Sequence, residues 1–229
     1  MIFEGIPDTE RFARYKTPPK PYTIYFHSTP LKTGITLTLW GKAAQFRDLA
    51  VLAVSAIGTR GVGVKRKAGY GRFSIKNIEE KSLDFSGFNK NYPIPYTPEF
   101  TLNLKTPLRI KRQGKVLTSF DIKEFMKTLL ERQSLLSYYY DENPEILDYR
   151  NLLKELESVS IISAATEFKY IERYSRRQKR FVNMAGIIGS VRIRDFPISL
   201  WDHICFGIYT GCGEHTTAGL GKYEILAEK

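Results

Sequence analysis

The feature that most constrains the fold of this chain is a glycine pattern that occurs twice, at an offset of 150 residues. Residues 68–75 read AGYGRFSI, and residues 218–225 read AGLGKYEI. At the same offset, Gly61 and Gly63 correspond to Gly211 and Gly213. Each copy therefore contains G-x-G, a short spacer, a second G-x-G, a basic residue, an aromatic residue and then an isoleucine. A match that keeps one register over this length predicts two related folding units in one chain.

The segments before the two glycine loops have matching patterns. Segment 44–57 carries apolar residues at helical spacing, namely Phe46, Leu49, Ala50, Ala53, Val54 and Ile57. Segment 196–209 does the same with Trp201, Ile204, Cys205 and Ile208. Alternating apolar residues ahead of each helix predict a strand. The repeated unit is therefore predicted to be strand, helix, glycine loop, strand.

The C-terminal half contains a complete set of elements. They are, in order, a strand (99–110), an amphipathic helix (119–140), a second helical stretch (143–159), the two strands of a hairpin (160–174 and 181–193), and the repeated helix and strand. Asp121 and Glu124 fit a capping box at the start of the first helix. The order β-α-β-β-α-β is the ferredoxin-like pattern.

The N-terminal half follows the same pattern incompletely. Segments 21–26 and 34–40 predict a hairpin, after which come the helix, the glycine loop and a strand. No opening strand and helix are predicted. We therefore predict an α+β protein of two tandem ferredoxin-like (βαββαβ) domains, the first lacking its opening β-α. The predicted domains are residues 1–96 and 97–229.

The polarity of the glycine loops argues against a nucleotide site. Walker loops and dinucleotide fingerprints run strand, glycines, helix, and they place the phosphate at the helix N-terminus. Here the order is helix, glycines, strand, and no G-K-[ST] follows. Binding of ATP or NAD is therefore not expected.

The charge of the chain favours a polyanionic partner. With 35 Lys and Arg against 24 Asp and Glu, the formal net charge is +11, and the isoelectric point is about 9.5. Such a balance favours nucleic acid first and a membrane surface second. Solvated lysines on an ordinary soluble protein are the alternative.

Other classes of site and location have little support in the sequence. The two cysteines, Cys205 and Cys212, form no CxxC, and with three scattered histidines they give no metal-ligand spacing. We therefore predict no metal and no cofactor. The first residues carry no signal-peptide pattern, and the longest apolar run, 49–58, is far shorter than the ~20 residues of a membrane span. A cytoplasmic protein without membrane contact is expected.

The glycine loops and two basic clusters are the candidate binding segments. Exposed amides beside glycines can bind anions, although a tight turn packed on the sheet is the alternative. The candidate RNA-binding residues are Lys65, Arg66 and Lys67 in the first loop, Gly211, Gly213, Thr216, Thr217, Gly219 and Gly221 in the second, Arg109 and Lys111 in cluster 108–115, and Arg176, Arg177, Lys179 and Arg180 in cluster 173–180. Tyr138, Tyr139 and Tyr140 can stack bases, but at the end of an amphipathic helix packing is the preferred interpretation.

Taken together, these segments resemble the CRISPR-associated repeat-processing endoribonucleases of the RAMP superfamily. The resemblance rests on KTPLRIKRQGKV, FKYIERYSRRQ, MAGIIGSV and GCGEHTTAGLGKYEI, in this order, and spans about residues 98–226. It implies paired ferredoxin-like folds and binding of CRISPR repeat RNA. It also implies metal-independent cleavage, in which the 2′-OH attacks the adjacent phosphate and leaves a 2′,3′-cyclic phosphate and a 5′-OH.

The resemblance leaves the general base open. Many relatives carry an active-site histidine in a first β-α segment, which this chain is predicted to lack. His27, after a strand, and His215, within the second glycine loop, are the candidate catalytic residues. His203 lies off the apolar stripe of its helix, and a surface position is predicted for it.

Two other functions remain open from the sequence. A non-catalytic RAMP subunit would hold the processed RNA within an effector complex, and a basic module would bind nucleic acid without preferring RNA. Other Cas proteins or a second copy of the chain are possible partners.

Overall fold

The computed structural model describes residues 18–28, 33–63, 68–82, 94–142, 144, 149–175 and 178–227. The C-terminal half is built on a four-stranded sheet of β3 (Phe100–Leu108), β6 (Ser160–Lys169), β9 (Gly186–Arg194) and β10 (Tyr223–Ala227). The strand order is β10-β3-β9-β6, and every neighbouring pair is antiparallel. This order confirms the ferredoxin-like fold class that was predicted.

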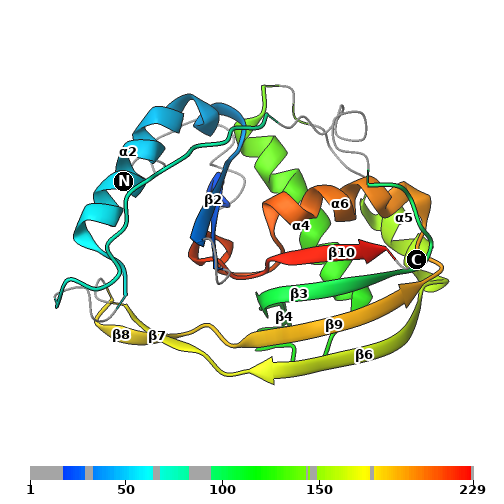
Figure 1. Ribbon diagram of the computed structural model, residues 1–229. Helices are drawn as coiled ribbons and strands as arrows, with labels where there is room; N and C mark the ends of the chain where they lie inside the picture. Colours follow the sequence, from blue (N-terminus) through cyan, green and yellow to red (C-terminus); the bar gives the residue numbers. More distant parts are fainter. Residues whose placement is uncertain are drawn as a thin grey trace.

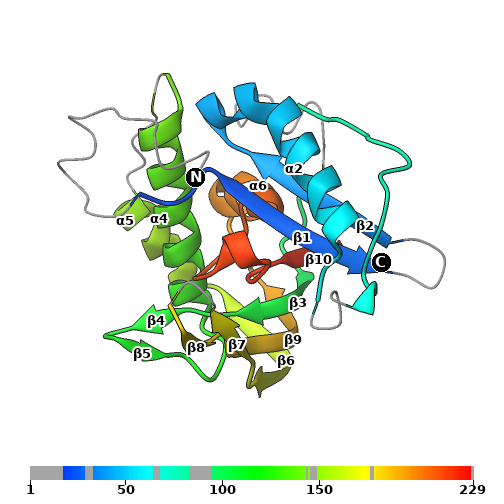
Figure 2. The same cartoon turned by 90° about the vertical axis from the view of Figure 1, so that its left-hand side faces the viewer.

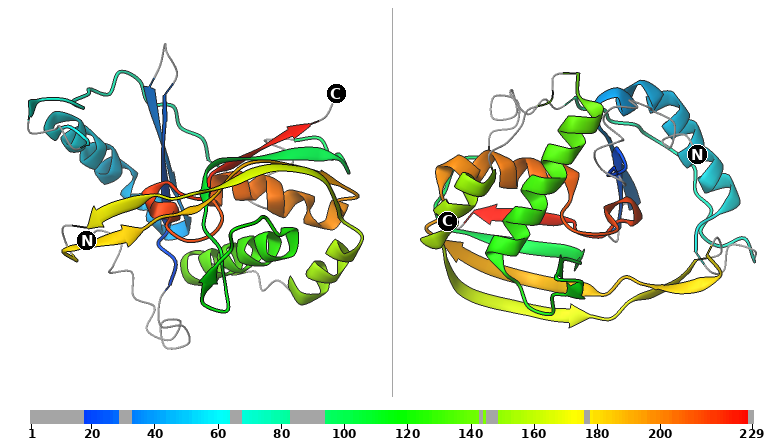
Figure 3. Two further views of the ribbon diagram at one scale, coloured as in Figure 1. Left: turned by 90° about the horizontal axis from the view of Figure 1, so that it is seen from below. Right: turned by 180° about the vertical axis from the view of Figure 1, so that it is seen from behind.

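Two helices cover one face of this sheet (Figure 3). They are α4 (Ile122–Tyr140) and α6 (Trp201–Thr210), and the short α5 (Tyr149–Lys154) follows α4. Alternation along the strands sends every second side chain toward the helices, so Phe100, Leu102 and Leu104 of β3 are buried against Phe125 and Leu129 of α4. This layer is the main hydrophobic core.

The start of α4 agrees with the predicted role of Asp121 as the capping residue. The Asp121 carboxylate accepts hydrogen bonds from the backbone N–H of Lys123 at 2.9 Å and of Glu124 at 3.2 Å. It thereby satisfies two of the four N–H groups that a helix leaves unpaired at its start.

Short elements complete the C-terminal half. They are the hairpin β4 (Lys111–Arg112) and β5 (Lys115–Val116), the hairpin β7 (Glu172–Ser175) and β8 (Arg180–Asn183), and the 3₁₀ turns η3 (Glu155–Glu157), η4 (Ile198–Leu200) and η5 (Thr216–Ala218). Strands β7 and β8 continue β6 and β9 beyond the edge of the four-stranded sheet (Figure 1).

The N-terminal half is smaller. An antiparallel pair, β1 (Tyr22–Ser28) and β2 (Thr33–Leu39), leads into the 3₁₀ turn η1 (Gly41–Phe46) and helix α2 (Arg47–Arg60). The prediction of a strand after the first glycine loop is wrong, because residues 71–82 are described and form no strand.

Helix α2 forms as predicted, but its apolar face is not buried. Leu49, Leu52 and Ile57 are 42%, 66% and 40% exposed. Within α2, which is described throughout, Gly58 alone is buried. A two-stranded sheet is too narrow to cover a helix face, and this explains the exposure.

The two halves meet along β1 and the end of α4. Thr23 donates a hydrogen bond to the Tyr209 carbonyl at 3.0 Å, and the Tyr140 hydroxyl donates to the Pro19 carbonyl at 2.7 Å. The ring of Trp40 meets Phe206 edge-on at 5.4 Å between centroids. Tyr139 and Tyr140 are buried in this joint, as the packing interpretation of the tyrosine run predicts.

Candidate functional site

The two glycine loops have nearly the same backbone. Corresponding glycines have φ angles of 76° and 68° (Gly61 and Gly211), 90° and 85° (Gly63 and Gly213), 84° and 90° (Gly69 and Gly219), and 71° and 70° (Gly71 and Gly221). Within each loop the same hydrogen bond closes the turn, from Val62 N–H to the Gly71 carbonyl at 2.9 Å and from Cys212 N–H to the Gly221 carbonyl at 3.0 Å. The predicted internal duplication is therefore confirmed at the level of the loop.

The second loop is a packed structure that only glycines permit. A Cβ added at Gly221 would overlap the backbone carbonyl of Cys212, and one at Gly213 would overlap the carbonyl of Arg109. Positive φ is also disfavoured for residues with a side chain. Two glycines of the candidate RNA-binding set thus have a structural reason to be present, whether or not RNA touches them.

The loop begins at the end of α6, where three carbonyls have tertiary partners. The carbonyl oxygens of Ile208, Tyr209 and Thr210 accept hydrogen bonds from Lys222 Nζ (2.7 Å), Thr23 Oγ1 (3.0 Å) and Arg132 Nε (2.9 Å). Carbonyls in the last turn of a helix lack partners within it, and the helix dipole favours cations there. Helix α4, strand β1 and the residue after the loop together hold the start of the loop in place.

Strand β1 lies against the glycine loop (Figure 2). The Tyr25 hydroxyl donates a hydrogen bond to the Leu220 carbonyl at 3.4 Å, and Lys222 Nζ lies 5.0 Å from the centre of the Tyr25 ring. Burial raises the pKa of Tyr25 well above its usual range, so the hydroxyl stays protonated and donates. Because side chains alternate along a strand, His27 follows Thr23 and Tyr25 on the face that meets the loop, about 7 Å beyond Tyr25. His27 itself is exposed.

Glu214 ties the loop to the end of β3. Its carboxylate pairs with Arg109 Nε at 2.9 Å and with Lys111 Nζ at 2.8 Å, and its backbone N–H donates to the Arg109 carbonyl at 2.8 Å. Arg109 also donates to the Ala185 carbonyl at 3.0 Å and is 7% exposed. Burial by itself raises the pKa of Glu214, but Lys111 and Arg109 outweigh it and leave the pKa below its ordinary value.

The ion pairs Arg109–Glu214 and Lys105–Glu224 should differ strongly in how much they stabilise the fold. Glu214→Gln leaves the buried Arg109 guanidinium without its counter-charge, and we expect a loss of about 2–3 kcal/mol, the partial exposure of Glu214 reducing the usual cost. The matched control is Glu224→Gln, whose partner Lys105 is exposed, and the expected loss is below about 1 kcal/mol. Urea unfolding of both variants measures the difference, and equal losses would contradict the role of Glu214 as a tether.

His215 follows this tether and is exposed. It has left-handed backbone geometry with φ 61°, and its carbonyl accepts the Ala218 N–H at 2.8 Å. Partial burial of the ring lowers the pKa of His215, Glu214 opposes this shift, and the cations Arg109, Lys111 and Arg173 lower the pKa further. The imidazole is therefore neutral at pH 7 and can accept a proton.

The remaining predicted residues are spread over neighbouring elements. Thr216 is buried and Thr217 half-buried in η5, Lys179 occupies the β7–β8 turn with φ 50°, and Arg180 is exposed and donates to the Gln178 side chain at 3.2 Å. Lys65, Arg66, Lys67, Arg176 and Arg177 lie outside the described residues. Arg109, Lys111, His215 and the loop glycines are the predicted residues that the structure brings together.

The predicted surface position of His203 is wrong. It is buried, its Nδ1 lies 3.0 Å from Gln133 Oε1, and Gln133 Nε2 donates to its carbonyl at 2.8 Å. Helix α4 packs on the side of α6 that the sequence pattern leaves polar, and Gln133 supplies the polar partner. Burial lowers the pKa of this imidazole.

Sequence reasoning also missed Tyr25 and Lys222. Lys222 occupies the basic position that follows each second G-x-G, where the first copy has Arg72, so the repeat itself carried a signal. Tyr25 had no signal beyond its place in a predicted strand.

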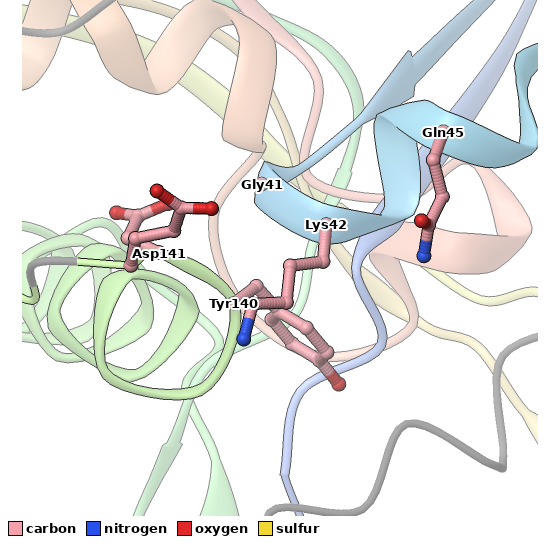
Figure 4. Close-up of a pocket in the computed structure, with 6 residues that line it drawn as sticks. Gly41, Lys42, Gln45, Tyr140 and Asp141 are labelled. Atoms are coloured by element: carbon pink, nitrogen blue, oxygen red, sulfur yellow. The ribbon is translucent and has the colours of Figure 1, made fainter.

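Other parts of the described structure are weaker candidates for a functional site. The pocket in Figure 4, about 360 Å³, lies between η1 and the end of α4 and is lined by Lys42, Gln45, Tyr140, Asp141 and Glu142 beside Gly41. Its charges are of mixed sign, so it attracts neither anions nor cations strongly.

Among the described residues, no three His, Cys, Asp or Glu side chains gather closely enough to hold a metal ion. The helices in the described part of the chain include none that is long and apolar enough to cross a membrane.

Comparison with known proteins places this geometry in a family. Residues 102–223, from β3 to β10 and including the glycine loop, match the model of the CRISPR-associated endoribonuclease Cas6. No protein with a curated description matches the chain.

Solved structures support the fold. The Cas6 (TTHB231) product complex has a TM-score of 0.65 at 14% identity, over 95% of this chain and 87% of the other. The Cas6 (TTHA0078) product complex has a TM-score of 0.61 at 18% identity, over 98% and 87%. Thermus thermophilus Cas6 (TTHB231) has a TM-score of 0.57 at 16% identity, over 95% and 85%. With the matched family model spanning more than half of the sequence and these structures sharing its fold, the chain belongs to the CRISPR-associated endoribonuclease Cas6 family.

Proposed function

We propose that this protein binds the repeats of a CRISPR transcript and cleaves them without a metal ion. The observation that carries the proposal is the position of His215. A neutral imidazole lies on the exposed side of the glycine loop, near the cations Arg109, Lys111 and Arg173. A transesterification at a phosphate needs a base and positive charge at one place.

The reaction joins the 2′-oxygen of one nucleotide to the adjacent phosphorus and breaks the bond from phosphorus to the 5′-oxygen. The products are a 2′,3′-cyclic phosphate and a 5′-OH. In this proposal His215 takes the proton of the attacking 2′-OH, and His27 is the candidate donor to the leaving 5′-oxygen. His27 suits this role because it is exposed on the loop-facing side of β1.

The cations divide into two groups in this proposal. Lys111 is 44% exposed at its side chain and can reach a phosphate while it pairs with Glu214. Arg109 is buried and acts by holding Glu214 and the loop. Lys179 and Arg180 extend the phosphate-binding surface in this proposal. Lys65, Arg66, Lys67, Arg176 and Arg177 stay candidate RNA-binding residues on the evidence of the sequence alone.

A cleavage assay in EDTA tests the proposal. End-labelled repeat RNA from the CRISPR array of the host should be cut, and the same RNA with one 2′-deoxy residue at the cut position should stay intact, because the nucleophile is missing. Product ends should be 2′,3′-cyclic phosphate and 5′-OH. Tight binding of both RNAs without cleavage would contradict the nuclease and favour a non-catalytic RNA-binding subunit. A requirement for added Mg²⁺ would contradict the metal-independent route.

A further inference from the structure

Strand β2 contains a glycine at a position where its backbone does not require one. Gly34 lies in the run TGITLTL, in which β-branched residues favour a strand and glycine weakens it. The φ angle of Gly34 lies outside the left-handed region, so a residue with a side chain could adopt the same backbone. This glycine is therefore explained by what lies against it, not by the course of the chain.

The ring of His27 fills the place that a side chain at residue 34 would take. His27 and Gly34 are direct partners in the antiparallel β1–β2 ladder, and cross-strand partners project from the same face of a sheet. A Cβ added at Gly34 would overlap Nε2 of His27 and lie 2.7 Å from its Cε1 and 3.0 Å from its Cδ2. Carbon atoms in contact are normally about 3.5–4 Å apart. The imidazole therefore rests on the bare Cα of Gly34.

This contact limits where the His27 ring can lie. His27 is exposed, and an exposed side chain ordinarily exchanges between several rotamers. The missing Cβ at residue 34 admits the rotamer that places the ring over β2, on the face of the β1–β2 pair that meets the glycine loop. A side chain at residue 34 would exclude this rotamer and displace the ring.

We propose that Gly34 is a positioning residue, which leaves space over β2 so that the His27 imidazole lies within reach of the leaving 5′-oxygen of the RNA. The inference rests on the proposed function in one respect, that His27 protonates this oxygen. The protonated imidazole gives its N–H proton to the oxygen as the bond from phosphorus to that oxygen breaks, and the ring is left neutral. A general acid has to lie within hydrogen-bond reach of the atom that it protonates, so the position of the ring affects the rate.

Gly34→Ala tests the inference because it should slow cleavage without weakening the fold. The added methyl group displaces the ring by about 1 Å, and a misplacement of this size costs up to about 10²-fold in rate. Single-turnover cleavage of the repeat RNA should fall by about 10–10²-fold, whereas binding of its 2′-deoxy form should stay the same. The midpoint of thermal unfolding should be no lower than in the wild type, because alanine is more stable than glycine in a strand and an exposed ring can move aside.

An RNA whose leaving group needs no proton isolates the role of the donor. When sulfur replaces the 5′-oxygen at the cut position, the leaving group is a thiolate, which is stable without a proton near neutral pH because a thiol is far more acidic than an alcohol. Gly34→Ala and His27→Ala should both cleave this 5′-sulfur RNA at close to the wild-type rate. On the ordinary RNA, Gly34→Ala should add nothing to the effect of His27→Ala, because the ring that it displaces is already gone.

Thr36→Ala is the matched control on the same strand. Thr36 lies two residues beyond Gly34 on the same face of β2, is exposed, and pairs with Tyr25 instead of His27. Its replacement leaves the space over Gly34 unchanged, so cleavage of both RNAs should proceed at the wild-type rate.

Other outcomes would overturn the inference. Normal cleavage of the ordinary RNA by Gly34→Ala, beside slow cleavage by His27→Ala, would contradict the positioning role alone. A Gly34→Ala defect that persists on the 5′-sulfur RNA, or that consists of weaker binding of the 2′-deoxy RNA, would assign Gly34 to direct contact with RNA instead. A wild-type protein that binds repeat RNA without cleaving it would contradict the proposed function, and with it any catalytic use of His27.

Discussion

Gly221→Ala is expected to destabilise the protein by about 3–5 kcal/mol, among the largest losses that one methyl group can cause. Gly221 has a φ of 70°, and its Cβ would overlap the carbonyl of Cys212, which is backbone and cannot rotate away. The same residue holds the turn through the hydrogen bond from Cys212 N–H to its own carbonyl. Relief of the overlap therefore requires opening the loop that β1 and β3 pack against. Urea unfolding and the midpoint of thermal unfolding measure the loss.

The matched control for this variant lies in the other copy of the loop. Gly69 has a φ of 84°, and nothing lies within 4 Å of an added Cβ. Gly69→Ala places a side chain at positive φ without causing a clash. The expected loss of stability is therefore only the backbone cost, about 1–2 kcal/mol. A Gly221→Ala loss no larger than that of Gly69→Ala would show that the loop yields easily, and it would contradict the close packing as the reason for this glycine.

His215→Ala should lower the rate of repeat cleavage by about 10²–10⁴-fold, the range that a positioned general base contributes. Affinity for the uncleaved 2′-deoxy RNA should change by a small factor only, because a neutral imidazole adds no charge to the phosphate surface. Single-turnover cleavage of the repeat RNA and equilibrium binding of its 2′-deoxy form measure the two effects separately. A cleavage rate that falls only in proportion to affinity would contradict a catalytic role.

The shifted pKa of His215 also predicts how the cleavage rate changes with pH. A general base works when it is unprotonated, and the pKa of His215 lies below the ordinary value of 6.5 because burial and three nearby cations disfavour the charged form. The rate should therefore rise as pH increases through this lowered pKa. Glu214 raises the pKa of His215, so Glu214→Gln should move the rise to lower pH.

His27→Ala is the comparison for the assignment of the base. His27 lies on β1 rather than in the loop, and a donor to the leaving oxygen would also matter for the rate. If His27→Ala abolished cleavage while His215→Ala cut normally, the base would lie on β1 and the assignment to His215 would be wrong.

Much of the C-terminal half was predictable because its signals are local. The apolar alternation of β3, the carboxylate of Asp121 at the start of α4 and the glycine register around Gly221 each depend on near neighbours in sequence. The N-terminal half was less predictable. Helix α2 formed where its spacing indicated, yet Leu52 is exposed and no strand follows the first loop, because helical periodicity does not specify whether a sheet is present to cover it.

The candidate site was likewise predictable from the sequence only in part. Basic residues in cluster 108–115 were visible in the sequence, but nothing local distinguishes Arg109, which is buried, from Lys111, which is partly exposed. Both pair with Glu214, which lies more than one hundred residues away in the chain. The burial of His203 against Gln133 likewise depends on two helices that meet only after folding.

The sequence by itself determined the duplicated glycine loop, the order of the C-terminal strands and helices, and the excess of positive charge, since propensity, periodicity and composition are properties of the chain. Tertiary structure alone decided which cations hold the loop and which face solvent, that β1 lies on the loop with His27 on the same side, and that the His27 ring lies over Gly34. The physical reason is that ion pairing, burial and a shifted pKa depend on distances between residues that the chain brings together only when it folds.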